Sequence, residues 1–154
     1  ELGLRSQVAG VPRIDLHAEV DRRVKRFMGD AAAYSYVAMR DAIADAGLEL
    51  DQVTSERTGL IAGSGGGSPQ WQIEVGDLLR NRGVRKVGPF MVPRTMSSTV
   101  SASLATAFGI RGPSYSISAA CATSAHCIGA AADLISRGGR TSSSPAAARR
   151  CTGG

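Results

Sequence analysis

Apolar residues recur at helical spacing between Asp30 and Gly47, which predicts a helix in this segment. Asp30 is a suitable N-cap for this helix, and Gly47 is expected to end it as the C′ residue. Upstream, residues 21–27 predict a short basic helix, whereas residues 1–20 show no sustained period and are expected to form a loop. The recurring positions of the long helix are Ala32, Tyr36, Met39, Ile43 and Ala46.

Short strands alternate with helices along the rest of the chain. Residues 58–63 predict a buried strand that enters the glycine-rich loop S-G-G-G-S, and Ser and Pro then open a helix over residues 68–80. Residues 93–108 are helical by pattern, residues 114–118 predict a second strand, and an alanine-rich helix is expected over 122–136. This alternation predicts an α/β fold built in layers.

The composition favours a single domain in a reducing compartment. The 154 residues are 43% hydrophobic, which is enough for one core, and no apolar run is long enough to span a membrane. The three cysteines form an odd count without metal-ligand spacing. We therefore expect a reduced cytoplasmic protein that uses no metal and no cofactor.

The net charge of +5 would ordinarily suggest nucleic-acid binding, but its distribution argues against that function. Residues 140–154 contain three arginines and no acid, so the other residues carry a net charge of only +2. Aromatic residues make up 5% of the chain, too few for an obvious base-stacking surface. We expect no nucleic-acid partner.

Cys121 carries the clearest chemical signal. It lies in the run S-I-S-A-A-C-A-T-S-A-H, where the second expected strand ends and the alanine-rich helix begins. Free N–H groups and the positive end of a helix favour an anion at such a corner, and the thiolate is the nucleophilic form of cysteine. Ala122, Thr123 and Ser124 leave room for a substrate carbonyl beside the sulfur and the backbone amides. The alternative for an isolated cysteine is a buried structural role.

Several further segments extend this signal in order along residues 1–139. They are R-F-M-G-D at 26–30, A-I-A-D-A-G-L at 42–48, G-L-I-A-G-S-G-G-G-S-P at 59–69, K-V-G-P-F at 86–90 and S-A-A-C-A-T-S-A-H at 118–126. Together they resemble the β-ketoacyl-acyl carrier protein synthases, the condensing enzymes of fatty-acid synthesis, and among these the type I synthases. The resemblance implies part of a thiolase-type layered fold, namely an incomplete N-terminal half.

The same resemblance implies roles for individual residues. Cys121 aligns with the nucleophile that accepts the acyl chain before decarboxylative condensation with malonyl-acyl carrier protein. Gly66 falls at a position that lines the acyl pocket, and Met96 falls where the partner subunit of the family homodimer contributes to that pocket. The alternatives are turn geometry for Gly66 and core packing for Met96.

The resemblance also implies that two pairs of basic residues dock the acidic acyl carrier protein. These are Arg23, Arg26, Arg82 and Arg85. The alternative is that these residues simply lie on a solvated face. The family's two histidines and lysine that support condensation lie in its later half. His126 lies about 140° around a helix from Cys121 and His17 lies in the irregular N-terminal region, so neither is expected to replace them. Cys127 is expected in the core.

The character of the sequence changes at residue 140, where a low-complexity stretch begins. This stretch can be back-translated into a nucleotide sequence that, when read from its third nucleotide, encodes D-I-V-F-A-G-G-G-E-E-V-H-W. That peptide would form a strand and a Gly-rich turn like those of the family at this point. We therefore expect a frameshift near codon 139, with 1–139 a partial synthase domain and 140–154 a non-native, disordered tail. The leading hypothesis is a piece of a fatty-acid elongation acyltransferase, inactive alone. The alternatives are an inactive or binding-only fragment, or a polyketide-type condensing domain.

Overall fold

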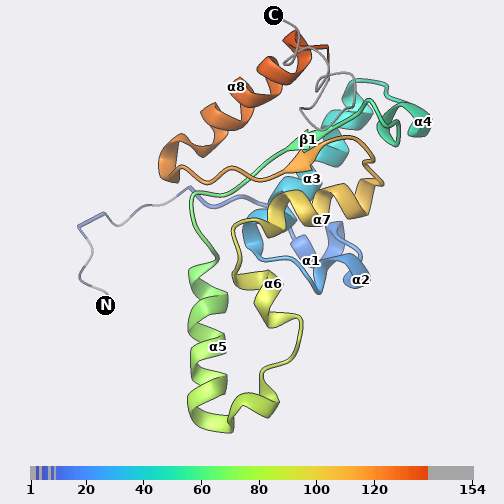
Figure 1. Ribbon diagram of the computed structural model, residues 1–154. Coiled ribbons are helices and arrows are strands. Elements are labelled where there is room, and N and C mark those ends of the chain that lie inside the picture. Colours follow the sequence, from blue (N-terminus) through green and yellow to red (C-terminus); the bar gives the residue numbers. More distant parts are fainter. Residues whose placement is uncertain (1–2, 4, 7, 9, 139–154) are drawn as a thin grey trace, which may run out of the picture.

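A pair of short parallel strands lies between helices in the described part of the chain (Figure 1). The computed structural model describes residues 3, 5–6, 8 and 10–138, and the predicted tail at 140–154 lies outside them. The elements in chain order are α1 Leu16–Glu19, α2 Arg22–Lys25, α3 Asp30–Asp45, α4 Leu50–Val53, β1 Leu60–Ile61, α5 Pro69–Arg82, η1 Val84–Lys86, α6 Met91–Thr95, α7 Thr99–Phe108, β2 Ser114–Tyr115, η2 Ala120–Ala122 and α8 Thr123–Ser136. The predicted α/β arrangement is confirmed.

The strands run in the same direction, with Leu60 opposite Ser114 and Ile61 opposite Tyr115. Parallel neighbours need a long crossover, which α5, α6 and α7 supply here. α8 lies on one side of the pair and contacts β1, whereas α3 and α7 lie on the other side (Figure 1). Both strands occupy the predicted segments but are shorter than expected.

The prediction of a loop over residues 1–20 is wrong at its end, because α1 forms there. The Asp15 carboxylate accepts a hydrogen bond from the His17 N–H at 2.8 Å and caps this single turn. Asp21 caps α2 in the same way, accepting from the Arg23 N–H at 2.7 Å, and this helix confirms the short basic helix expected at 21–27. Two Asp caps in close succession explain why residues without an apolar period still form helical turns.

The N-cap of α3 is Gly29 rather than Asp30, which corrects the predicted boundary by one residue. A Cβ on Gly29 would lie 2.6 Å from the Arg94 carbonyl oxygen, so the backbone packing there excludes a larger residue. Asp30 instead lies in the first turn, where its charge favours the helix dipole. The predicted C′ role of Gly47 is confirmed: its φ is +61°, and Leu48 donates its N–H to the Ile43 carbonyl at 3.2 Å.

The helix expected over 93–108 is two helices, α6 and α7, separated at residues 96–98. Met96 is extended, with φ −89° and ψ 138°, and its N–H bonds the Pro93 carbonyl at 3.2 Å. The Thr99 hydroxyl donates to the same carbonyl, so side-chain and turn hydrogen bonds replace the helical ladder. The helix predicted from 68 is confirmed as α5, which continues to Arg82.

The core of the described residues forms where α3 crosses α7. Its buried members are Val20, Met28, Ala32, Ala33, Val37, Val100 and Leu104. Tyr36 and Met39 pack against this cluster, and the Tyr36 ring stacks on Phe108 with centroids 5.1 Å apart. Ala32 and Ala33 have short side chains, which lets α7 approach α3 closely. Of the recurring positions predicted for α3, Ala46 is exposed at the helix end.

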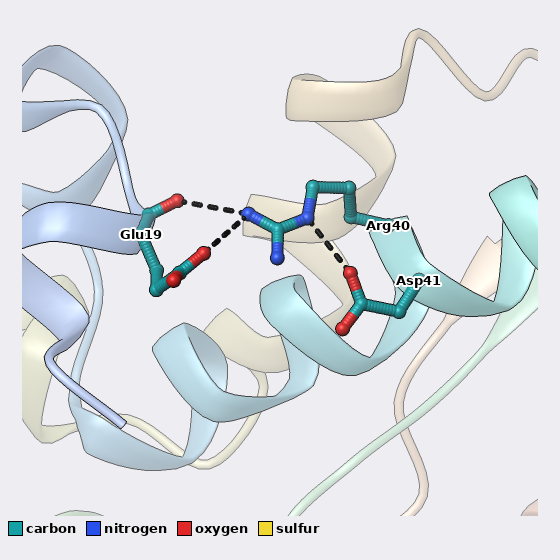
Figure 2. A network of polar contacts seen from close by, with 3 residues as sticks. All are labelled: Glu19, Arg40 and Asp41. Atoms are coloured by element: carbon teal, nitrogen blue, oxygen red, sulfur yellow. Dashed lines mark hydrogen bonds and ion pairs between the residues drawn. The ribbon is translucent and has the colours of Figure 1, made fainter. Parts of the chain in front are cut away.

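Arg40 joins α3 to α1 at the surface (Figure 2). Its guanidinium donates to the Glu19 carboxylate at 2.8 Å, to the Glu19 carbonyl at 3.3 Å and to the Asp41 carboxylate at 2.9 Å. The hydrogen bonds with Glu19 and Asp41 raise the pKa of Arg40. Because both charges of each pair are largely exposed, we assign this network to orienting α1 rather than to the free energy of unfolding.

We predict that Leu104→Ala lowers the free energy of unfolding by about 2–5 kcal/mol, because it leaves a cavity between α3 and α7. Leu104 is 3% exposed, whereas Leu50 is 75% exposed, so Leu50→Ala is the matched control. Urea unfolding followed by circular dichroism measures both variants. Equal midpoints for the two variants would contradict the assignment of Leu104 to the core.

Candidate active site

Cys121 lies at the corner between β2 and α8, in the single turn η2, as the sequence predicts. Its thiol is free and exposed. The residue before it, Ala120, has φ +45°, a left-handed conformation that residues with a Cβ rarely adopt. Such strain persists only where the surroundings impose it, and it turns the chain sharply enough to present Cys121 at the surface.

Thr123 imposes this conformation from beneath the corner. It is 4% exposed, and its hydroxyl donates to the Ala120 carbonyl at 2.8 Å while accepting from the Ala119 N–H at 2.9 Å. The Ala122 N–H also bonds the Ala119 carbonyl at 2.9 Å. The sequence indicates only that Thr123 is small enough to leave room for a substrate, whereas in the structure its hydrogen bonds hold the turn.

α8 begins two residues after the cysteine and has 14 residues. The Thr123 N–H bonds the Ala120 carbonyl within η2. No side chain caps the N-terminus of α8, so the N–H groups of Ser124 and Ala125 have no acceptor within the helix. These donors and the helix dipole favour negative charge at the corner. The corner therefore combines an exposed thiol with N–H donors that suit an oxyanion.

The glycine-rich loop 63–67 packs its backbone directly against the segment before Cys121. A Cβ on Gly63 would overlap the Ile117 carbonyl oxygen, and one on Gly65 would lie 2.6 Å from the Ala120 carbonyl oxygen. The Ser118 hydroxyl donates to the Ser64 carbonyl at 3.0 Å. Sequence analysis missed this role of Gly63 and Gly65, although glycines two residues apart after a strand are the signal of such a close approach.

Gly66 and Met96, predicted to line an acyl pocket, do lie together. Both border a small cavity between the glycine-rich loop and the starts of α3 and α7, together with Thr99 and Val100. Its volume is about 10 Å³, roughly the space of one water molecule, and Cys121 does not line it. A Cβ on Gly66 would meet nothing within 4 Å, so a small side chain fits there.

The four arginines predicted to dock a carrier protein are all exposed but fall in two places. Arg23 and Arg26 border a large cavity beside α2. Arg82 ends α5, which reaches away from the strands, and Arg85 follows in η1 (Figure 1). The structure therefore does not bring the two pairs into one patch.

The remaining sequence candidates lie apart from the corner or face the interior. His17 lies on α1 and His126 on α8, and both are exposed, whereas Cys127 is buried as expected. No group of three or more His, Cys, Asp or Glu residues suited to a metal ion occurs in the described ranges. Within the same ranges, no helix has the length and apolar character needed to cross a membrane.

We predict that Gly63→Ala lowers the free energy of unfolding by at least about 1–3 kcal/mol, because its methyl group has no space against Ile117. Gly66→Ala, three residues later in the same loop, is the matched control. The free energy of unfolding of this variant should be unchanged or raised by up to about 1 kcal/mol. Thermal unfolding of the two variants tests this. The packing argument fails if Gly63→Ala is as stable as Gly66→Ala.

Comparisons with known proteins show which family the chain belongs to. A family model described as Beta-ketoacyl synthase, N-terminal domain, matches residues 12–141. The chain is 55% identical over 139 residues to 3-oxoacyl-[acyl-carrier-protein] synthase 1 of Haemophilus influenzae, and 52% identical over 138 residues to that of Escherichia coli K12. These alignments cover 90% and 88% of this chain. The chain spans about a third of the length of these relatives, 34% in each case.

Solved structures extend the likeness to the fold. A β-ketoacyl synthase from Burkholderia phymatum superposes with a TM-score of 0.70 at 26% identity, covering 84% of this chain and 32% of that one. A type II polyketide ketosynthase, solved in complex with its acyl-carrier protein, gives a TM-score of 0.71 at 21% identity, covering 83% and 37%. The predicted thiolase-type fold is confirmed. The chain belongs to the β-ketoacyl synthase family, whose N-terminal domain model matches residues 12–141.

Proposed function

We propose that this chain supplies the acyl-accepting cysteine of a 3-oxoacyl-[acyl-carrier-protein] synthase of fatty-acid elongation. The observation that carries the proposal is the exposed Cys121 on a strained turn at the start of α8. The high identity to two type 1 synthases supports the choice of substrate class. The polyketide ketosynthase is similar in fold alone, so fatty-acid elongation is the preferred assignment.

The chemistry follows from the corner. The Cys121 thiol gives up its proton to solvent, and a sulfur electron pair forms a bond to the carbonyl carbon of an acyl thioester while the carbonyl π pair moves to oxygen. The N–H groups of Ser124 and Ala125, which have no acceptor within α8, lie at the helix end where they favour that negative charge. When the carbonyl re-forms, the carrier's sulfur leaves as a thiolate and is protonated by solvent, so the acyl chain remains on Cys121.

Condensation with malonyl-acyl carrier protein is the second half of the proposed reaction. In that step the acyl group leaves Cys121 as a new carbon–carbon bond forms and carbon dioxide departs. We assign the acyl chain to the side of the corner where Gly66 and Met96 lie, because an open position at Gly66 leaves space that a larger side chain would remove. A homodimer in which Met96 reaches the partner's pocket belongs to the same proposal, and Met96 is 49% exposed.

The proposed partner is an acidic acyl carrier protein. The four exposed arginines Arg23, Arg26, Arg82 and Arg85 supply positive charge for steering it. The polyketide ketosynthase whose fold is similar was solved with its own carrier protein, which supports a carrier as the partner class. A cytoplasmic location also belongs to the proposal, because Cys121 and Cys127 are both free thiols.

We predict that incubation with an acyl-acyl carrier protein transfers the acyl group to Cys121. Intact-mass and peptide mass spectrometry should find the added mass on this residue, and Cys121→Ala should show none above background. Cys127→Ala is the matched control and should be acylated normally, because Cys127 is buried and 8% exposed. Acylation at Cys127, or acylation that survives Cys121→Ala, would refute the nucleophile.

We predict that Arg23→Glu slows carrier-protein association about 10-fold or more at low salt, because the charge reversal opposes the acidic partner. The difference from the unmodified chain should shrink at high salt, where the interaction is screened. Arg111→Glu is the control, since Arg111 is also exposed but lies before β2 and is not one of the four arginines. Stopped-flow association rates measure the effect. Equal slowing by both substitutions would mean that only net charge matters.

A further inference from the structure

A second cavity lies away from the cysteine, between α1, α2, the start of α3 and the start of α5. Its volume is about 910 Å³, within the range of small-molecule binding sites. None of the residues of the corner lines it. Its charged lining consists of the cations Arg22, Arg23, Lys25, Arg26 and Arg94, the carboxylates Asp21 and Asp30, and His17.

The positive charge of this cavity is not neutralised within the described residues. The ion pairs among the described residues are made by Arg40 and Arg80, which do not line the cavity, and by none of its five cations. Of the two carboxylates, Asp21 is already bound to the N–H of Arg23, where it caps α2. Five cations against two carboxylates leave an excess of three positive charges facing one space.

Aromatic rings hold two of these cations in place. The Arg94 guanidinium lies over the Trp71 ring, 4.2 Å from its centroid, and its Nε donates to the Arg26 carbonyl at 2.9 Å. The Arg26 guanidinium lies 4.7 Å from the Phe27 centroid and 5.0 Å from the Phe90 centroid. Because stacking has already restricted both side chains, a ligand that binds them costs little further side-chain entropy.

Trp71 lines the same cavity. Its Nε1 is buried, so the residue contributes the ring that holds Arg94 in place rather than a hydrogen-bond donor to the cavity.

We propose that this cavity binds a small phosphoryl-bearing anion with at least two negative charges. A phosphoryl group offers several acceptor oxygens in the geometry that guanidinium groups bind in pairs, and it carries more charge than a carboxylate. The excess of three positive charges matches a diphosphate better than a monoanion. The site lies apart from Cys121, but it shares Arg23 and Arg26 with the proposed carrier-docking surface, so a bound anion would compete with the carrier protein for these two residues.

Trp71 is the only tryptophan of the chain, so its fluorescence reports directly on the cavity. Inorganic pyrophosphate, ADP and citrate are titrated at constant ionic strength set with sodium chloride. We expect a saturable change with pyrophosphate and with ADP, and none with citrate or with sodium chloride alone. Tighter binding of ADP identifies an organic phosphate as the ligand, and equal binding identifies the phosphoryl group itself.

Single substitutions distinguish binding in this cavity from non-specific attraction to the positive charge of the chain. Arg94→Gln and Arg22→Gln should each weaken pyrophosphate binding about 10-fold, the loss of one charge-assisted interaction, while Arg111→Gln should leave it unchanged. Arg22→Gln does not remove the Arg94 guanidinium that stacks on Trp71, and calorimetric titration measures binding without relying on fluorescence. The proposal is overturned if pyrophosphate gives no saturable signal, if citrate binds equally well, if only an acidic peptide binds, or if both variants bind like the unmodified chain.

Discussion

The close backbone contact between the glycine-rich loop and the segment before Cys121 is the constraint on which the candidate site depends. Gly63 and Gly65 allow the loop after β1 to lie against residues 117–120, where any side chain would collide with a carbonyl oxygen. This contact continues the pairing of two strands that are only two residues long each. The position of the corner is therefore set by backbone packing rather than by an extended sheet.

Strain and burial are combined at that corner. Ala120 is held at φ +45° while the neighbouring Cys121 remains exposed, and the buried hydroxyl of Thr123 satisfies the polar groups on both sides of the turn. The strained residue is an alanine, so the surrounding hydrogen bonds must maintain a conformation that glycine would adopt freely. A rigid turn beside the uncapped start of α8 keeps the thiol, the free N–H groups and the helix dipole in one orientation.

The crossover between the strands has a different character from the core. α3 and α7 meet through buried small and aliphatic residues, whereas α5 reaches outward and contacts mainly η1 and α6 (Figure 1). This outward segment carries Trp71 and Arg94 on the wall of the cationic cavity, and Met96 beside the glycine-rich loop. These three residues lie on a part of the chain that contributes nothing to the core cluster, and binding surfaces are commonly found on such connecting segments.

The sequence by itself determined the order of the two strands and of the longer helices, the corner position of Cys121 and the end of α3 at Gly47. These are local properties, because helical spacing, a Gly C′ residue and the run of small residues around the cysteine act within a few positions of the chain. The family resemblance was likewise readable from short segments. The predicted N-cap of α3, Asp30, was wrong by one residue. The N-cap is Gly29, which packs against Arg94, a residue distant in sequence.

Only the tertiary structure decided the remaining features, since each joins segments far apart in the chain. Hydrogen bonds of Met96 and Thr99 to Pro93 divided the predicted 93–108 helix, although Ser, Thr and Ala content is compatible with a continuous helix. The meeting of Gly66 with Met96, the separation of Arg23 from Arg82, and the stacking of Arg94 on Trp71 depend on how the crossover folds back. Residue patterns specify local conformation, whereas such contacts depend on the packing of the whole domain.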